Sequence, residues 1–88
     1  MKNLNFEPRA QKEIEYWRKI DKAITKKIVR LIEEILQTPY HGTGKPEPLK
    51  HELSGCWSRR IDKEHRIVYR VEGEEVVILS CRFHYWHN

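Results

Sequence analysis

Apolar residues recur at helical spacing in the first half of the chain. Leu4 and Phe6 come first and alternate with polar neighbours, which is typical of a short, half-buried strand. Ala10, Ile14 and Trp17 then lie four and three residues apart, so a helix would carry all three on one face. The pattern predicts a strand followed by an amphipathic helix.

Proline and aspartate residues mark the expected helix ends. Pro8 suits the first helical position, because the N–H that proline lacks would have no partner there. Asp21 can cap a second, longer helix, and Thr38-Pro39 ends it, since proline disfavours helical geometry in the preceding residue. The apolar stripe of this second helix consists of Ile24, Ile28, Leu31 and Ile35, with Ile32 beside it.

From residue 41 onward the pattern changes from helical to extended. Residues 41–48 are so rich in glycine and proline that we expect an irregular loop. Three β-like stretches follow at 57–61, 66–71 and 76–82, and a hairpin turn is expected at Glu72-Gly73-Glu74. The order β-α-α-β-β-β predicts a two-layer α+β fold, with the two helices packed on one face of a mostly antiparallel, twisted sheet. The other sheet face would be free to hold a ligand.

Length and composition restrict the class of protein. The chain has 88 residues and a formal net charge of +4, so we expect one domain over residues 1–88 with a mild preference for polyanionic partners. No apolar run approaches the roughly 20 residues that span a bilayer, and the first residues lack the apolar core of a signal peptide. Cys56 and Cys81 are expected to be small buried thiols in a protein of the reducing cytoplasm.

Side chains suited to RNA cleavage occur in the second half. RNA can be cut without a metal ion because its own 2′-hydroxyl can attack the adjacent phosphate. This reaction needs a base for the hydroxyl, a cation for the crowded phosphate and an acid for the departing oxygen. Glu47 could be the base, Arg66 the cation and His84 the acid. Histidine suits the acid role because its unperturbed pKa, about 6.5, is near working pH.

Each of these residues also has an ordinary interpretation. Glu47 could be a solvated loop charge and His84 a surface histidine, and sheet arginines could pair with Asp62 and Glu64. The spacing of the other histidines matches no metal-ligand motif, and these are His41, His51, His65 and His87. The pattern alone therefore predicts a small basic α+β domain that binds nucleic acid, with no metal site and no cofactor.

Several separated motifs resemble one bacterial family. The matching motifs are Gly44 to His51, Leu53-Ser54-Gly55, Trp57-Ser58-Arg59-Arg60, Glu64 to Tyr69, and Cys81 to Tyr85. In this order they resemble the YoeB/Txe-type toxins of type II toxin–antitoxin modules, in the RelE/ParE superfamily. The resemblance covers nearly the whole chain, and residues 86–88 form a short C-terminal extension. It implies a RelE-like fold and a ribosome-dependent mRNA interferase, a metal-independent endoribonuclease that cuts mRNA in the ribosomal A site.

The resemblance also implies roles for individual residues and partners. Glu47 would be the general base, His84 the general acid, Arg66 the cation at the phosphate, and Tyr85 would orient the substrate. The residues expected to hold the RNA backbone are Lys45, Lys50, Arg59 and Arg60. Expected partners are mRNA, the ribosome, a YefM-type antitoxin that threads an acidic segment over the basic site, and operator DNA through the antitoxin complex. A homodimer is also implied.

Two other functions remain open at this point. ParE-type toxins share the architecture but inhibit DNA gyrase, and such a protein would need neither Glu47 nor His84. A non-catalytic module that only binds ribosomes or nucleic acid would need the basic residues alone. Only a measurement of turnover separates this second alternative from a nuclease.

Overall fold

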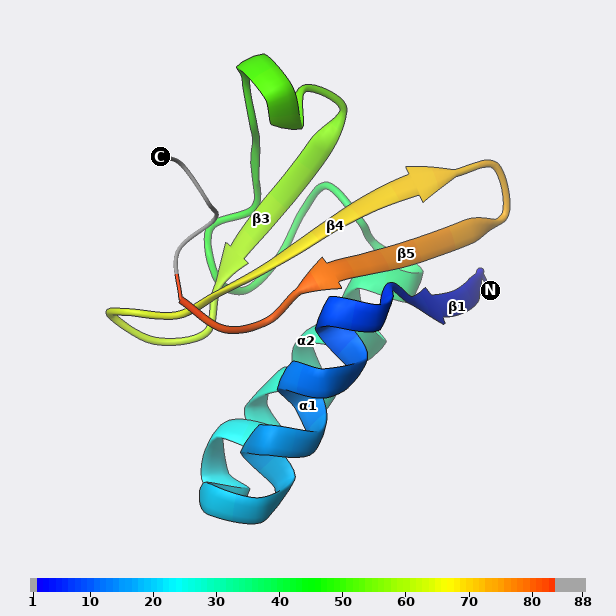
Figure 1. The fold of residues 1–88 in the computed structure, drawn as a ribbon. Coiled ribbons are helices and arrows are strands. Elements are labelled where there is room, and N and C mark those ends of the chain that lie inside the picture. The colour runs from blue at the N-terminus through cyan, green and yellow to red at the C-terminus, as the bar shows by residue number, and fades with distance from the viewer. Residues whose placement is uncertain (1, 84–88) are drawn as a thin grey trace.

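The computed structural model describes residues 2–83, and Figure 1 shows two helices lying side by side against one sheet. The elements are β1 (Asn3–Phe6), α1 (Pro8–Ile20), α2 (Lys22–Gln37), β2 (Glu47–Pro48), the 3-10 helix η1 (His51–Leu53), β3 (Cys56–Arg60), β4 (Arg66–Glu72) and β5 (Glu75–Ser80). The strand order is β1-β5-β4-β3-β2, with β1 parallel to β5 and the other pairs antiparallel. The predicted α+β fold is confirmed.

The helix ends lie where the sequence predicts them. Pro8 opens α1, and the Asp21 carboxylate accepts a hydrogen bond from the backbone N–H of Ile24 at 3.1 Å, which caps α2. Thr38 follows the last residue of α2. The predicted apolar stripes form the core against the inner sheet face, together with Ile67, Tyr69 and Ile78. Trp17 is buried among them, as expected.

The loop predicted at residues 41–48 contains a strand, so this part of the prediction is wrong. Glu47 pairs with Ser58 and Pro48 with Trp57, which makes β2 the edge strand beside β3. Proline is tolerated at an edge because its missing N–H breaks no ladder inside the sheet. A two-residue strand has no periodicity of its own, and η1 likewise went unpredicted.

The outer face of the sheet is less open than predicted. Alternation along β3 and β4 turns Ser58 and Val68 away from the helices, and a register shift in β5 pairs Ser80 with Val68, yet all three residues are buried. Elsewhere on this face Arg70 reaches Glu7 at 3.5 Å, beside β1. Glu47 on β2 and Arg60 at the end of β3 remain exposed.

The two cysteines are free and buried, as predicted. Burial raises the pKa of the Cys81 thiol to about 12, with a further contribution from the Glu13 carboxylate. Burial also raises the pKa of the Cys56 thiol, so neither thiol is a nucleophile near neutral pH. Within residues 2–83, no helix is both long enough and apolar enough to cross a membrane.

Candidate cleavage site and nucleic-acid interface

One row of residues crosses the outer face of the sheet from edge to interior. The strand register pairs Glu47 with Ser58, Ser58 with Val68, and Val68 with Ser80. The last three are buried, whereas the Glu47 side chain, on the edge strand, is 49% exposed. The row therefore ends in one carboxylate that a ligand can reach.

Arg66 lies next to this carboxylate. It begins β4 opposite Arg60, and its Nη1 lies 3.6 Å from Glu47 Oε1. The Arg66 side chain is only 12% exposed, so its charge is largely shielded from solvent, whereas Arg60 is exposed. The backbone N–H of Arg66 donates to the carbonyl of Phe83 at 2.9 Å. One residue thus joins Glu47 to the segment that leads into His84.

Residues 81–83, here called the C-terminal arm, are fastened to α1. The Cys81 N–H donates to the Glu13 carboxylate at 2.8 Å, and its carbonyl accepts from Trp17 Nε1 at 2.9 Å. The Arg82 guanidinium stacks 3.7 Å from the Tyr16 ring centre. The predicted catalytic residues His84 and Tyr85 follow this arm but lie outside the described residues, so their roles stay predictions.

A hollow of about 460 Å³ opens beside Arg60 and Arg66. Its lining consists of Lys27, Thr43, Gly44, Arg60, Ile61, Asp62, Lys63 and Arg66. Burial raises the pKa of Asp62, but N–H groups of His65 and Glu64 outweigh burial and lower it overall, so this carboxylate is ionised at neutral pH. Four cationic side chains surround that single negative charge, which suits the hollow to a phosphate backbone.

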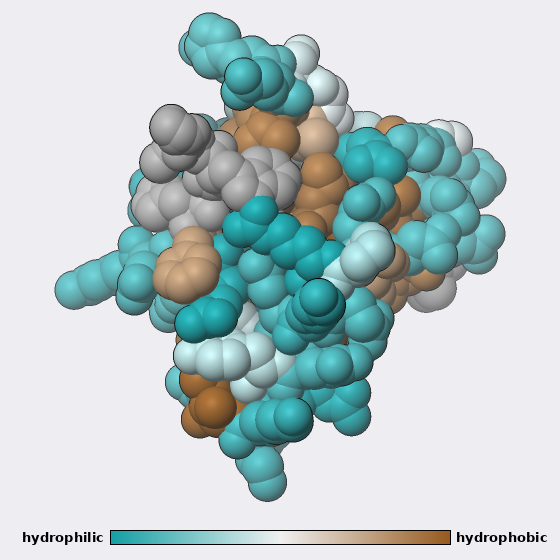
Figure 2. Space-filling model, in the orientation of Figure 1, coloured by the Kyte–Doolittle hydropathy of each residue, from teal (hydrophilic) through white to brown (hydrophobic). Residues whose placement is uncertain are grey.

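Lys45 and Lys50, also predicted to bind RNA, are both exposed. Lys45 follows Gly44 of the hollow, and Lys50 follows β2 by two residues. Hydrophilic residues cover most of the molecular face in Figure 2, and hydrophobic residues appear in separate areas between them. Among residues 2–83, no three His, Cys, Asp or Glu side chains are grouped so that they could hold a metal ion.

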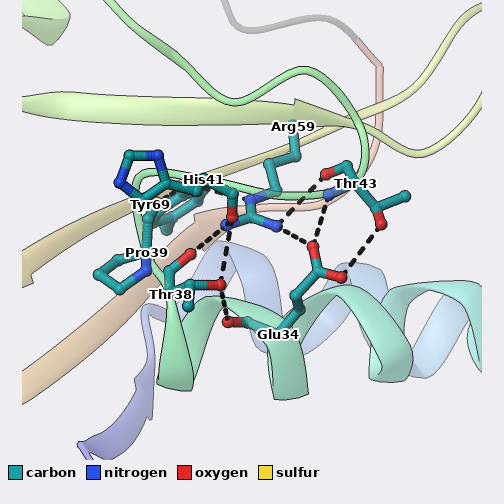
Figure 3. A network of polar contacts seen from close by, with 7 residues as sticks. All are labelled: Glu34, Thr38, Pro39, His41, Thr43, Arg59 and Tyr69. Atoms are coloured by element: carbon teal, nitrogen blue, oxygen red, sulfur yellow. Dashed lines mark hydrogen bonds and ion pairs between the residues drawn. The ribbon is translucent and has the colours of Figure 1, made fainter.

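Arg59 does not lie where an RNA-binding residue must lie, and this prediction is corrected. Its side chain is 0% exposed and points from β3 toward the end of α2 (Figure 3). All five guanidinium N–H donors are used. The acceptors are Glu34 Oε1, the carbonyls of Thr38 (2.6 Å), His41 (2.7 Å) and Thr43 (3.3 Å), and Tyr69 Oη (3.2 Å). A guanidinium without free donors or exposed area cannot contact a phosphate.

Residues 38–46, here called the glycine loop, are built around this arginine. Glu34 accepts hydrogen bonds from the Thr43 N–H and hydroxyl, and the Thr43 N–H is the main reason that its pKa is lowered, with Arg59 adding to the effect. Gly42 has a φ of +123°, and a Cβ there would come within 2.3 Å of Glu34 Oε1. The Gly44 carbonyl accepts from the Arg60 N–H at 2.7 Å. Arg59 therefore acts on the site indirectly, by fixing the loop that precedes Glu47.

Sequence reasoning missed several residues of this region. Lys63 lies between two strands that carry predicted site arginines, and that proximity was an available signal. Period-two alternation also placed Arg59 on the same face as Ile61, which indicated burial. No local signal linked Lys27 or Glu34 to the site, because α2 meets the glycine loop only in the folded chain.

The chain is similar in sequence to known proteins. The family model for the YoeB-like toxin of bacterial type II toxin–antitoxin systems matches residues 6–85. The Escherichia coli K12 protein Toxin YoeB is 57% identical over 70 residues, covering 80% of this chain and 83% of the relative. Toxin RelK of Mycobacterium tuberculosis is 51% identical over 85 residues, covering 97% and 100%.

Solved structures of Staphylococcus aureus proteins are similar as well. A YoeB dimer has a TM-score of 0.86 and 43% identity, covering 94% of this chain and 97% of that one. A YoeB–YefM complex has a TM-score of 0.88 and 41% identity, covering 97% and 99%. The likeness therefore extends over the whole described architecture.

Proposed function

The chain belongs to the YoeB-like toxin family of bacterial type II toxin–antitoxin systems, and on that premise we propose that it is a ribosome-dependent mRNA interferase. It would cut mRNA in the ribosomal A site and so stop translation. The chemistry would be transesterification by the RNA's own 2′-hydroxyl, carried out by Glu47, Arg66 and His84.

The proposed reaction assigns one task to each side chain. Glu47 takes the proton of the 2′-hydroxyl as its oxygen bonds to phosphorus, and Arg66 neutralises the charge that builds on the phosphate oxygens. The bond from phosphorus to the 5′-oxygen breaks, and His84 gives that oxygen a proton. The products are a 2′,3′-cyclic phosphate and a 5′-hydroxyl, and Tyr85 would orient the RNA. Each proton transfer contributes roughly 10²–10⁴ to the rate.

The observation that carries the proposal is the position of Arg66 between two distant parts of the chain. Its guanidinium lies 3.6 Å from Glu47, and its backbone N–H binds the carbonyl of the residue before His84. Base and acid must flank one phosphate, and the cation must face it. Arg66 supports this arrangement because it contacts both Glu47 on β2 and the C-terminal arm.

The RNA backbone would follow the basic surface beside this centre. Lys45, Lys50 and Arg60 remain candidates for phosphate contacts, and Lys27 and Lys63 of the hollow join them. Exposed lysines attract phosphates mainly through charge, so binding should weaken as salt increases.

Partners are proposed from the family. A YefM complex and a YoeB dimer have been solved for relatives, so a YefM-type antitoxin and self-association are expected for this chain. An acidic antitoxin segment would neutralise the basic surface. The toxin–antitoxin complex would then bind operator DNA.

Primer extension on programmed ribosomes tests the proposed activity. Wild-type protein should create 5′ ends within the A-site codon, and Glu47→Gln or His84→Gln should reduce their rate by roughly 10²–10⁴. Glu52→Gln is the matched control, because it removes the charge of an exposed carboxylate on η1. This variant should cut mRNA at the wild-type rate. Cleavage by Glu47→Gln at the wild-type rate would show that Glu47 is not the general base. Salt-sensitive binding without any cleavage would indicate a non-catalytic module, and inhibited DNA supercoiling a gyrase inhibitor.

A further inference from the structure

The backbone of Phe83 is held from both sides in an unusual conformation. Its φ is +65°, in the left-handed region that residues with a Cβ adopt at a cost of roughly 1–2 kcal/mol. Its N–H donates to Nδ1 of His65 at 2.7 Å, and its carbonyl accepts from the Arg66 N–H at 2.9 Å. Two neighbouring residues, His65 just before β4 and Arg66 at its start, therefore set the two peptide planes that flank Phe83.

The His65 ring is itself fixed in one orientation. Its backbone N–H donates to Asp62 Oδ1 at 2.7 Å, and its carbonyl accepts from the Ile61 N–H at 2.9 Å. The ring is edge-on to Trp17, with centroids 4.8 Å apart, and only 8% of the residue is exposed. Since a backbone N–H can only donate, Nδ1 carries a lone pair and the ring proton sits on Nε2, 3.6 Å from the Glu64 carboxylate.

We propose that His65 is a positioning residue for the general acid of the cleavage reaction. By accepting the Phe83 N–H, its neutral ring fixes the direction in which the chain leaves the arm and presents His84. This inference rests on the proposed function, because the acid role of His84 belongs to that proposal. Within residues 2–83, the His65 ring contacts Trp17, Glu64 and Phe83, so it acts on the reaction through the arm.

The bond from Phe83 to His65 is not needed to hold the arm onto the protein. Cys81 already binds Glu13 and Trp17 of α1, so β5 stays in place without the imidazole. His65 additionally fixes the orientation of the peptide bond between Arg82 and Phe83, and Phe83 directly precedes the proposed acid. Misplacing a reacting group by about 1 Å can cost on the order of 10²-fold in rate. A positioning role therefore predicts a loss in kcat.

Two substitutions separate an acceptor role from simple packing. In His65→Asn, Oδ1 is attached to Cγ as Nδ1 is, so the variant keeps an acceptor near the Phe83 N–H. His65→Leu fills similar space without an acceptor. The two variants are compared with wild type by hydrogen exchange at the Phe83 amide in the free, full-length protein, and by kcat and KM on programmed ribosomes.

Exchange at Phe83 should accelerate on the order of tenfold in His65→Leu and stay slow in His65→Asn, as expected for one lost hydrogen bond. The kcat of His65→Leu should fall by roughly 10–10², with KM unchanged, and His65→Asn should recover most of it. If amide exchange at Phe83 is unchanged in His65→Leu, the hydrogen bond from the Phe83 N–H to His65 does not hold the arm, whatever the activity. Normal kcat in His65→Leu despite fast exchange would overturn the positioning role. If the wild-type protein cuts no mRNA, the proposed function is wrong. The exchange rates would still test whether His65 holds the Phe83 amide.

Discussion

The glycine loop and the C-terminal arm reach the same end of the sheet but are fastened by different chemistry. The glycine loop is centred on one ion pair: buried Arg59 binds three of the loop carbonyls, and its partner Glu34 binds Thr43. The C-terminal arm is held by separate ties, from α1 to Cys81 and from His65 and Arg66 to Phe83. Most contacts of the glycine loop therefore converge on one ion pair, whereas those of the C-terminal arm come from several separate residues.

This difference predicts how the glycine loop and the C-terminal arm each respond to the loss of one side chain. Removing a buried cation leaves its acceptors without donors and its counter-ion unpaired, so the loss is large and cooperative. Removing one tie from the arm leaves the others in place. Damage to the glycine loop should therefore reduce stability first, whereas damage to the arm can reduce catalysis while the fold survives.

The largest expected effect is that of Arg59→Met. Methionine keeps much of the length but none of the donors, so Glu34 loses its cation and the loop carbonyls lose their partners. The free energy of unfolding should fall by about 3–5 kcal/mol, measured by denaturant titration. Arg60→Met, at an exposed position of the same strand, is the control and should change it by about 0.5 kcal/mol or less. Equal losses in the two variants would show that Arg59 is not the anchor.

A smaller effect is expected for Trp17→Phe, which tests the C-terminal arm. Phenylalanine keeps an aromatic ring but cannot donate to the Cys81 carbonyl, so a buried acceptor loses its partner. We expect a loss of about 1–3 kcal/mol in the same titration, clearly less than for Arg59→Met. A loss as large as that of Arg59→Met would contradict the distinction between one buried charged anchor and several separate hydrogen bonds.

The pH dependence of stability sharpens the comparison further. Because the Thr43 N–H and Arg59 lower the pKa of Glu34 in the folded state, its ionised form stabilises the protein at neutral pH. This contribution is complete above the usual carboxyl pKa of 4.5 and is lost as the pH falls through the lowered value. Glu34→Gln should thus be less stable than wild type at pH 7, and the gap should narrow toward pH 3. A constant gap would mean that the carboxylate charge contributes nothing.

The smallest expected effect concerns the hollow. Lys63→Ala removes one of its cations, and the KM on programmed ribosomes should rise by a factor of about five at low salt and less at high salt. Lys19→Ala, at the exposed end of α1, is the matched control and should leave KM unchanged. Equal effects of the two variants would show that only net charge matters, not the position of the hollow.

Local patterns were enough to predict most elements of the fold. The stripe from Ile24 to Ile35, the Asp21 cap and the turn at Glu72-Gly73-Glu74 each depend on residues close together in sequence, and the structure contains all three. The edge strand at Glu47-Pro48 was missed because its pairing comes from β3, not from its own sequence.

The candidate site was harder to predict for the same physical reason. Glu47 and Arg66 were named from their chemistry, and the structure places them in contact. Arg59 binds Glu34, which is 25 positions away in sequence, and His65 binds Phe83, which is 18 positions away. The sequence alone therefore did not show which groups these two side chains contact. Arg59 therefore looked like a phosphate ligand when it is an internal anchor.

The central claim is that the RNA's own 2′-hydroxyl is the nucleophile. It is tested by programming ribosomes with two messages that differ only by a 2′-deoxy nucleotide on the 5′ side of the scissile phosphate. The all-ribose message should be cut in the A site to give a 5′-hydroxyl end, and the substituted message should stay intact at that position. Cleavage of both messages at the same rate would contradict the mechanism, since the attacking oxygen would then come from elsewhere.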